Sequence, residues 1–240
     1  MGTQRLELID ATLREWDAVV VDVDAEGGIV LDRSAFFPGG GGQPPDEGVL
    51  LWGGVQTRIA GARKTIDDVM LIPVVGDPLP SVGQAVRGAL DDERRTALMR
   101  THSALHLLNG VIYRGWRLPV TSADMKPLEG RMDFDLAEVP DGFKDAVEEQ
   151  CNIEIEADRR IDVREMSSED AFAIEQVRVA ARDLLPTRLE TVRIVDIVGL
   201  DVEADGGTHV ASTRSIGRLE IVKIENKGKG FRRLRLRLPQ

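Results

Sequence analysis

A change of residue pattern near position 90 is the feature that most constrains the fold of this 240-residue chain. Before it, β-rich runs such as DAVVVDV (17–23) and GIVLDRSAFF (28–37) are separated by glycine and proline turns. Short strands at this spacing are typical of a small antiparallel barrel. After it, residues 91–116 begin with acids and space their apolar side chains as a helix does.

The rest of the chain mixes strand and helix patterns. Strand patterns occur at 130–136, 161–166, 191–204 and 215–239, and helical patterns at 141–160 and 167–177. We therefore predict an α+β fold, with a β-barrel domain over residues 1–88 that carries a glycine-rich loop. An α+β domain with an antiparallel sheet follows over residues 89–240.

Composition excludes several classes of protein. No apolar run approaches the roughly 20 residues of a membrane span, and residues 1–17 lack the apolar core of a signal peptide. The single cysteine, Cys151, cannot form an internal disulfide and is typical of a reducing compartment. We expect a cytoplasmic protein with no membrane partner, in an oligomeric state that the sequence leaves open.

Charge is distributed unevenly along the chain. The net charge of −10 argues against indiscriminate binding of nucleic acids. Residues 223–237 nevertheless carry seven basic side chains and one acid, Glu225. Such a segment contacts phosphates or forms a solvated strand edge protected by charge, and the pattern alone favours neither.

The chain contains three histidines, and two of them, His102 and His106, are four residues apart in a helical pattern. Residues at this spacing share one helix face, so both imidazoles can bind one ion. The alternative is an accidental pair, with one ring packed in the core. His209 adds weight to the metal site because it follows a Gly-Gly turn, and Asp205 precedes it by four residues. Together these residues form a His3Asp set that suits Zn²⁺, although Fe²⁺ and Mn²⁺ accept the same ligand types.

A run of four glycines interrupts the barrel pattern in RSAFFPGGGGQPPDEG (33–48). Such a run indicates a tight turn or close backbone approach to a ligand, and a plain barrel-corner loop is the alternative. No Gly-Lys-Ser/Thr follows it, so it is not a phosphate loop of that class. Phe36 and Phe37 beside it either stack on a base or pack in the barrel, and burial is the usual outcome for phenylalanine. The residues of this loop are Gly39, Gly40, Gly41, Gly42 and Gln43.

Three ordered motifs, FFPGGGGQPPDEG, LDDERRTALMRTHSALHLL and DGGTHVAST, resemble the AlaX family of free-standing alanyl-tRNA editing proteins. They are also similar to the editing region of alanyl-tRNA synthetase. GRMDFDL and ENKGKGFRR match the family pattern as well, so the resemblance covers nearly the whole chain. The glycine-rich N-terminal part corresponds to the larger AlaX type.

The resemblance implies a metal-dependent deacylase that hydrolyses the ester joining serine, and also glycine, to the alanine tRNA. His102, His106 and His209 match the zinc-binding histidines of the family, which serve its catalytic site. The fourth family ligand is a cysteine, and Asp205 stands at that position, so we expect zinc to be held less tightly. Ser34 takes the place of a threonine that the family uses for serine recognition. It is our fourth catalytic-site residue.

The resemblance also implies tRNA as the partner, and two further functions stay open. One is a tRNA-binding module with a structural metal and no turnover. The other is hydrolysis of a different mischarged tRNA. We expect the tRNA to contact the glycine loop and seven basic residues: Arg94, Arg95, Arg100, Lys227, Lys229, Arg232 and Arg233.

Overall fold

The computed structural model describes residues 2–175, 177, 190–228 and 230–239. The chain forms two compact units, Met1–Ala97 and Leu98–Gln240. The division falls within one long helix, α1 (Asp92–Trp116). The assignment of residues 1–88 and 89–240 to two domains stays a prediction.

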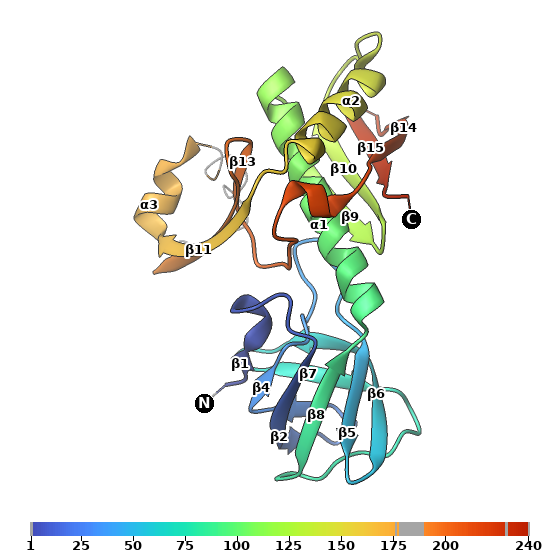
Figure 1. The fold of residues 1–240 in the computed structure, drawn as a ribbon, viewed down its shortest axis with the longest axis vertical. Coiled ribbons are helices and arrows are strands. Elements are labelled where there is room, and N and C mark those ends of the chain that lie inside the picture. The colour runs from blue at the N-terminus through green and yellow to red at the C-terminus, as the bar shows by residue number, and fades with distance from the viewer. Residues whose placement is uncertain (1, 176, 178–189, 229, 240) are drawn as a thin grey trace. The chain divides into compact units, whose positions relative to one another are not determined.

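The first unit is built around a closed antiparallel barrel (Figure 1). Trp16, Ala18 and Val20 alternate inward along its first strand and are buried. At Gly88 a Cβ atom would lie 2.4 Å from the Trp16 ring, so only glycine fits there. The barrel strands, in spatial order, are β2 (Glu15–Val23), β3 (Ile29–Leu31), β7 (Val69–Pro73), β6 (Val55–Lys64), β5 (Gly48–Trp52) and β8 (Ala85–Leu90).

A short N-terminal segment accompanies the barrel. Strand β1 (Gln4–Arg5) pairs in parallel with β4 (Arg33–Ser34), and a single 3-10 turn, η1 (Leu6–Leu8), follows β1. Thr3 Oγ1 donates to the Leu31 carbonyl at 3.0 Å, which ties this segment to β3.

The second unit contains a four-stranded antiparallel sheet that packs against α1. A Cβ atom at Gly130 of this sheet would lie 2.9 Å from Leu105 Cδ2 on the helix, so glycine permits the close approach. Helix α2 (Phe143–Glu156) turns Val147 and Cys151 into the interior. The strand order is β14 (Glu220–Asn226), β15 (Phe231–Arg237), β10 (Glu129–Asp135) and β9 (Val120–Lys126).

A separate three-stranded sheet completes the second unit, with β11 (Ile161–Ser167), β12 (Thr191–Ile197) and β13 (Asp201–Ala204) in that order. Ser167 caps the short helix α3 (Ser168–Ala173), because its hydroxyl accepts the Asp170 N–H. A 3-10 turn, η2 (Thr213–Ile216), leads into β14.

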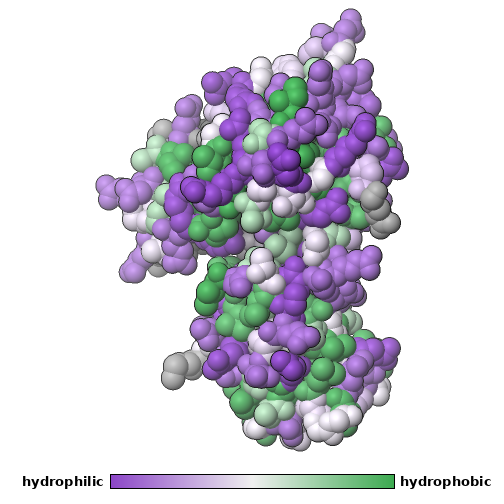
Figure 2. Space-filling view, in the orientation of Figure 1, coloured by the Kyte–Doolittle hydropathy of each residue, from purple (hydrophilic) through white to green (hydrophobic). Residues whose placement is uncertain are grey.

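These elements confirm the predicted α+β class with an N-terminal antiparallel barrel. No helix among the described residues is long and apolar enough to cross a membrane. On the face drawn in Figure 2, hydrophilic and hydrophobic residues alternate over the surface of each unit.

Candidate functional site

Two of the three histidines lie one turn apart on α1. His102 and His106 are both buried, and their ring centroids are 5.0 Å apart. The helix places them together because residues four apart share one face. The His3Asp hypothesis requires the third histidine to reach the same face.

The loop after β13 brings His209 and Asp205 to this face. Asp205 Oδ2 accepts the Gly207 N–H at 2.6 Å and lies 3.1 Å from His209 Nε2. The His209 ring stacks on His102 with centroids 4.3 Å apart. Ser103, which the sequence analysis did not single out, lies with Oγ 3.2 Å from His209 Nδ1 and accepts the Val210 N–H. The only sequence signal for Ser103 was its position directly after His102.

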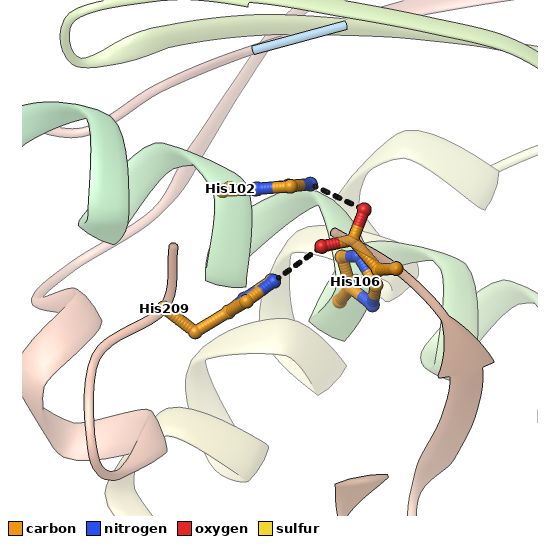
Figure 3. A group of neighbouring side chains, drawn as sticks. His102, His106 and His209 are labelled. Carbon is orange, nitrogen blue, oxygen red and sulfur yellow. Dashed lines mark hydrogen bonds and ion pairs between the residues drawn. The ribbon is translucent and has the colours of Figure 1, made fainter. Parts of the chain in front are cut away.

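The donor atoms of His102, His106, Asp205 and His209 all lie within 4.8 Å of one another. Figure 3 shows the three imidazoles around one carboxylate, whose two oxygens face His102 and His209. The separations are 3.6 Å from His102 Nε2 to Oδ1 and 3.1 Å from His209 Nε2 to Oδ2. A tetrahedral ion with bonds of about 2.1 Å holds its ligand atoms about 3.4 Å apart. The four side chains therefore fit a zinc-sized cation.

The protonation states of three of the four side chains, His102, Asp205 and His209, also suit a cation. Burial lowers the pKa of His102 well below its usual value and lowers that of His209 to about 4. Burial alone would raise the pKa of Asp205, but the neighbouring His102 and His209 imidazoles hold it well below its usual range. Near pH 7 the two imidazoles are neutral and the carboxyl is ionised, which are the forms that bind metals.

A second acidic group adjoins His106. Asp201 Oδ2 and Glu203 Oε2 lie 3.7 Å and 3.4 Å from its Nδ1. Burial raises the pKa of both carboxyls. Burial also opposes the charged form of His106, but Glu203, Asp201 and Asp205 outweigh this effect and raise its pKa to about 9. A cation that binds His106 near pH 7 therefore displaces a proton from its imidazole. Sequence reasoning missed this pair, although the spacing of two in DVE places both acids on one strand face.

The glycine loop is a tight turn in the first unit. Gly39, Gly40, Gly41 and Gly42 all have positive φ, between 59° and 133°, which other residues rarely adopt. Gly40 and Gln43 exchange backbone hydrogen bonds of 3.0 Å, and the Gln43 side chain is buried. The ligand contacts expected of this loop stay a prediction.

The residues that lead into the loop are buried. Ser34 Oγ accepts the Phe36 N–H at 3.1 Å. Phe36 packs edge-on against Trp16, and Phe37 is also buried. Core packing of both phenylalanines is confirmed. Stacking on a base does not fit rings that are buried in the first unit.

The structure contradicts the prediction that Arg95 contacts tRNA. Its side chain is 0% exposed and pairs with Asp46, and it donates to the Ala35 and Ala11 carbonyls at 2.6 and 2.9 Å. A buried charge is costly unless it is paired and hydrogen-bonded, and Asp46 and the two carbonyls supply these partners for Arg95. Arg95 therefore belongs to the interior of the first unit.

Other predicted tRNA contacts are less buried. Arg94 pairs with Glu47 at 3.2 Å, and Arg100 donates to the Ile216 carbonyl at 2.9 Å. Arg233 forms two hydrogen bonds to Asp133, at 2.7 and 2.8 Å, across the sheet. Lys227 is exposed, and Arg232 donates to the Ala137 carbonyl and to the Asn226 side chain. Lys229 lies outside the described residues.

The sequence of this chain is similar to those of alanyl-tRNA editing proteins and of alanine–tRNA ligases. Residues 192–235 match the family described as the threonyl and alanyl tRNA synthetase second additional domain. The chain is 32% identical to the alanyl-tRNA editing protein AlaX-M of Saccharolobus solfataricus, over 97% of both proteins. It is 33% identical to the AlaX-M protein of Methanosarcina acetivorans, again over 97% of each. It is also 31% identical to the alanine–tRNA ligase of Pyrococcus furiosus, over 97% of this chain and 25% of the ligase.

Proposed function

The chain belongs to the AlaX-M family of alanyl-tRNA editing proteins, and from this premise we propose that it hydrolyses the ester between serine and the alanine tRNA. Glycine is the second amino acid that we propose it removes. The reaction acts on free mischarged tRNA, and tRNA is accordingly the partner.

One observation carries the proposal: the convergence of His102, His106, Asp205 and His209 in the second unit. We propose that these four side chains hold a Zn²⁺ ion. When bound, such an ion supplies Lewis-acid chemistry, which polarises a carbonyl or lowers the pKa of water. The imidazoles and the carboxylate hold and orient it in a site from which protein atoms exclude most solvent.

The chemistry of the substrates supports an editing role. A pocket built for alanine rejects the added hydroxyl of serine only weakly, so aminoacylation of tRNA with serine is an expected error. A second site that binds this hydroxyl by hydrogen bonding discriminates in the opposite direction. We propose Ser34 for this recognition. Its hydroxyl accepts the Phe36 N–H and is 0% exposed, so this role requires the serine hydroxyl to reach a buried side chain.

We propose that exposed and partly buried basic residues bind the phosphates of the tRNA. Lys227 and Arg232 lie at the hairpin between β14 and β15, and Lys229 lies between them in the sequence. Arg94, Arg100 and Arg233 complete the proposed set. Because the chain is acidic overall, binding should depend on these local charges and weaken with salt.

A panel of charged tRNAs tests the function. Alanine tRNA carrying serine, glycine or alanine is incubated with the purified protein, with the chelated protein, and with the chelated protein reloaded with Zn²⁺. We expect release of serine and glycine, retention of alanine, and loss of release on chelation and in His209→Ala. Asp162→Asn is the matched control, because this carboxylate on β11 pairs with Arg160 at 2.7 Å and belongs to neither group of converging metal-ligand side chains.

Two outcomes would contradict the proposal. Stoichiometric tRNA binding without release of any amino acid, even at high protein concentration, would show a binding module with a structural metal. Release from a different tRNA in a wider panel, with seryl-charged alanine tRNA left intact, would assign another substrate. Metal analysis of Asp205→Ala tests the fourth ligand, since an unchanged metal content would remove Asp205 from the set.

A further inference from the structure

The acidic pair on β13 is not used by the four-ligand site. Asp201 and Glu203 are two residues apart, so both carboxylates project from the same strand face. That face meets α1 at His106. The glycine that follows Asn109 makes the close approach possible, because a Cβ atom at Gly110 would lie 2.8 Å from the Cβ of Asp201.

Asn109 fixes the orientation of both carboxylates. Its Nδ2 donates to Glu203 Oε1 and lies 3.5 Å from Asp201 Oδ1. Each acid therefore uses one oxygen for Asn109 and turns the other, Glu203 Oε2 or Asp201 Oδ2, toward Nδ1 of His106. Asn109 and His106 are three apart on α1 and share its face.

His106 Nδ1 lies close enough to both carboxylates to form one hydrogen bond after a small shift. His106 Nδ1 and Asp201 Oδ2 are buried, and neither has a hydrogen-bond partner among the described residues. The distance from His106 Nδ1 to Asp201 Oδ2 is 3.7 Å, which is too long for a hydrogen bond. The distance from His106 Nδ1 to Glu203 Oε2 is 3.4 Å, which is at the limit of one. A shift of a few tenths of an ångström toward either acid would satisfy the Nδ1–H group.

We propose that Glu203 and Asp201, held by Asn109, are positioning residues that keep the proton of His106 on Nδ1 and present Nε2 to the metal. A metal-binding imidazole commonly donates its other N–H to a carboxylate, which sets its tautomer and ring orientation and makes the ligand nitrogen more basic. This inference rests on the metal site of the proposed function. It adds to that site the residues that orient one of its ligands, His106.

The same three side chains, His106, Asp201 and Glu203, also form a group of metal-ligand type. A cation there would need the Nδ1 lone pair, whereas our proposal places a proton on that atom. The two arrangements exclude one another, so the metal stoichiometry distinguishes them.

The test measures metal affinity and the His106 tautomer, without tRNA. Competition with a chromophoric chelator gives the Zn²⁺ dissociation constant for the full chain, for Glu203→Ala, for Glu203→Gln, for Asp201→Ala and for the Asp162→Asn control. We expect the affinity to fall by about 10- to 100-fold when the acids are removed, and to stay unchanged in the control. Nitrogen-15 spectra of the imidazoles, with three histidines to assign, should show Nδ1–H for His106 in the zinc-loaded protein.

A double variant that exchanges the carboxylate and the amide between positions 203 and 109 is the control for misfolding. In a background that carries Asp201→Asn, so that no second carboxylate faces position 109, Glu203→Gln with Asn109→Asp keeps a hydrogen bond between these positions in the reverse direction and leaves a carbonyl oxygen for His106. We expect this double variant to regain part of the affinity that Glu203→Gln loses in the same background. Equal affinities in all variants, a His106 ring protonated on Nε2, or two bound ions per chain with the second lost in Glu203→Gln would each overturn the inference. Failure of the unmodified protein to bind zinc at all would instead overturn the proposed function.

Discussion

Helix α1 contributes to two buried polar clusters that differ in how their charges are balanced. Near its start, Arg95 and Asp46 form a complete set, in which each charge has its partner and the guanidinium also meets two carbonyls. Further along, His102 and His106 join Asp205 and His209 in a set of donor atoms with one carboxylate among them. The first cluster is satisfied by the protein alone, and the second is suited to a cation.

The difference separates stability from function. A satisfied buried ion pair makes the removal of one partner costly, because the other charge stays in a poorly solvating interior. A cluster of converging metal ligands stabilises the fold mainly when its ion is bound. Asp46 also accepts the Phe37 N–H at 2.7 Å, so the first cluster holds the base of the glycine loop.

The largest effect on stability is expected from Arg95→Ala. This change leaves Asp46 buried without its counter-charge, which typically costs about 3–5 kcal/mol of unfolding free energy. Denaturant unfolding of the first unit measures it. The double variant Arg95→Met with Asp46→Leu removes both charges and should recover part of the loss, because the Phe37 N–H then lacks its acceptor. A loss below about 1 kcal/mol in the single variant would mean that water reaches the pair.

The second cluster should respond in the opposite way to His209→Ala. We expect the deacylation rate to fall by more than about 100-fold. Loss of a residue that only orients a metal ligand typically costs about 10- to 100-fold, and His209 is a proposed ligand itself. The unfolding free energy of the chelated protein should fall by less than in Arg95→Ala, because Asp205 keeps His102 beside it and no ion is lost. Rates and unfolding curves of the same preparation make the comparison. A variant that lost stability without zinc and kept its turnover would reverse the roles of the two clusters.

Local patterns were sufficient to predict part of this arrangement. The helical spacing of apolar residues over 91–116 placed His102 and His106 on one helix face. The β-rich runs before the change of pattern near position 90 predicted the barrel. The partner of Arg95 was not predictable in this way, because Asp46 is 49 residues distant and an arginine in a helical pattern is normally solvated. The spacing of Asp201 and Glu203 placed them on one strand face, but the approach of that face to α1 depends on packing at Gly110.

Asp205→Cys sharpens the comparison by changing one ligand of the second cluster. Thiolate is a softer ligand than carboxylate and favours zinc over Fe²⁺ and Mn²⁺. We expect slower zinc loss to a chelator and a higher zinc-to-manganese affinity ratio, with serine release retained. Cys151 does not interfere, because its thiol is buried and burial raises its pKa. An unchanged metal preference would indicate that position 205 does not contact the ion.

The basic hairpin offers the same contrast between balanced and unbalanced charge at the surface. Arg233 pairs with Asp133, whereas Arg232 donates to uncharged oxygens. Arg232→Gln should therefore weaken tRNA binding more than Arg233→Gln, and should lower the slope of log affinity against log salt by about one. Binding isotherms at several salt concentrations measure both quantities. Equal slopes for the unmodified protein and Arg232→Gln would exclude this arginine as a phosphate contact.

The smallest effect is expected where a balanced pair lies at the surface of the barrel. Arg58 forms three hydrogen bonds to Asp77, two from its guanidinium and one from its backbone N–H, and these bonds lower the pKa of Asp77 from 3.8 to about 2. Because the folded-state pKa is depressed, the contribution of the pair is complete above about pH 4 and is lost as the pH falls toward 2. In Asp77→Asn the acid limb of the stability curve should be shallower over this interval, while stability at pH 7 changes little, since solvent screens exposed pairs. Thermal unfolding between pH 2 and 7 measures the limb. An identical limb in both proteins would assign the acid sensitivity to other carboxylates.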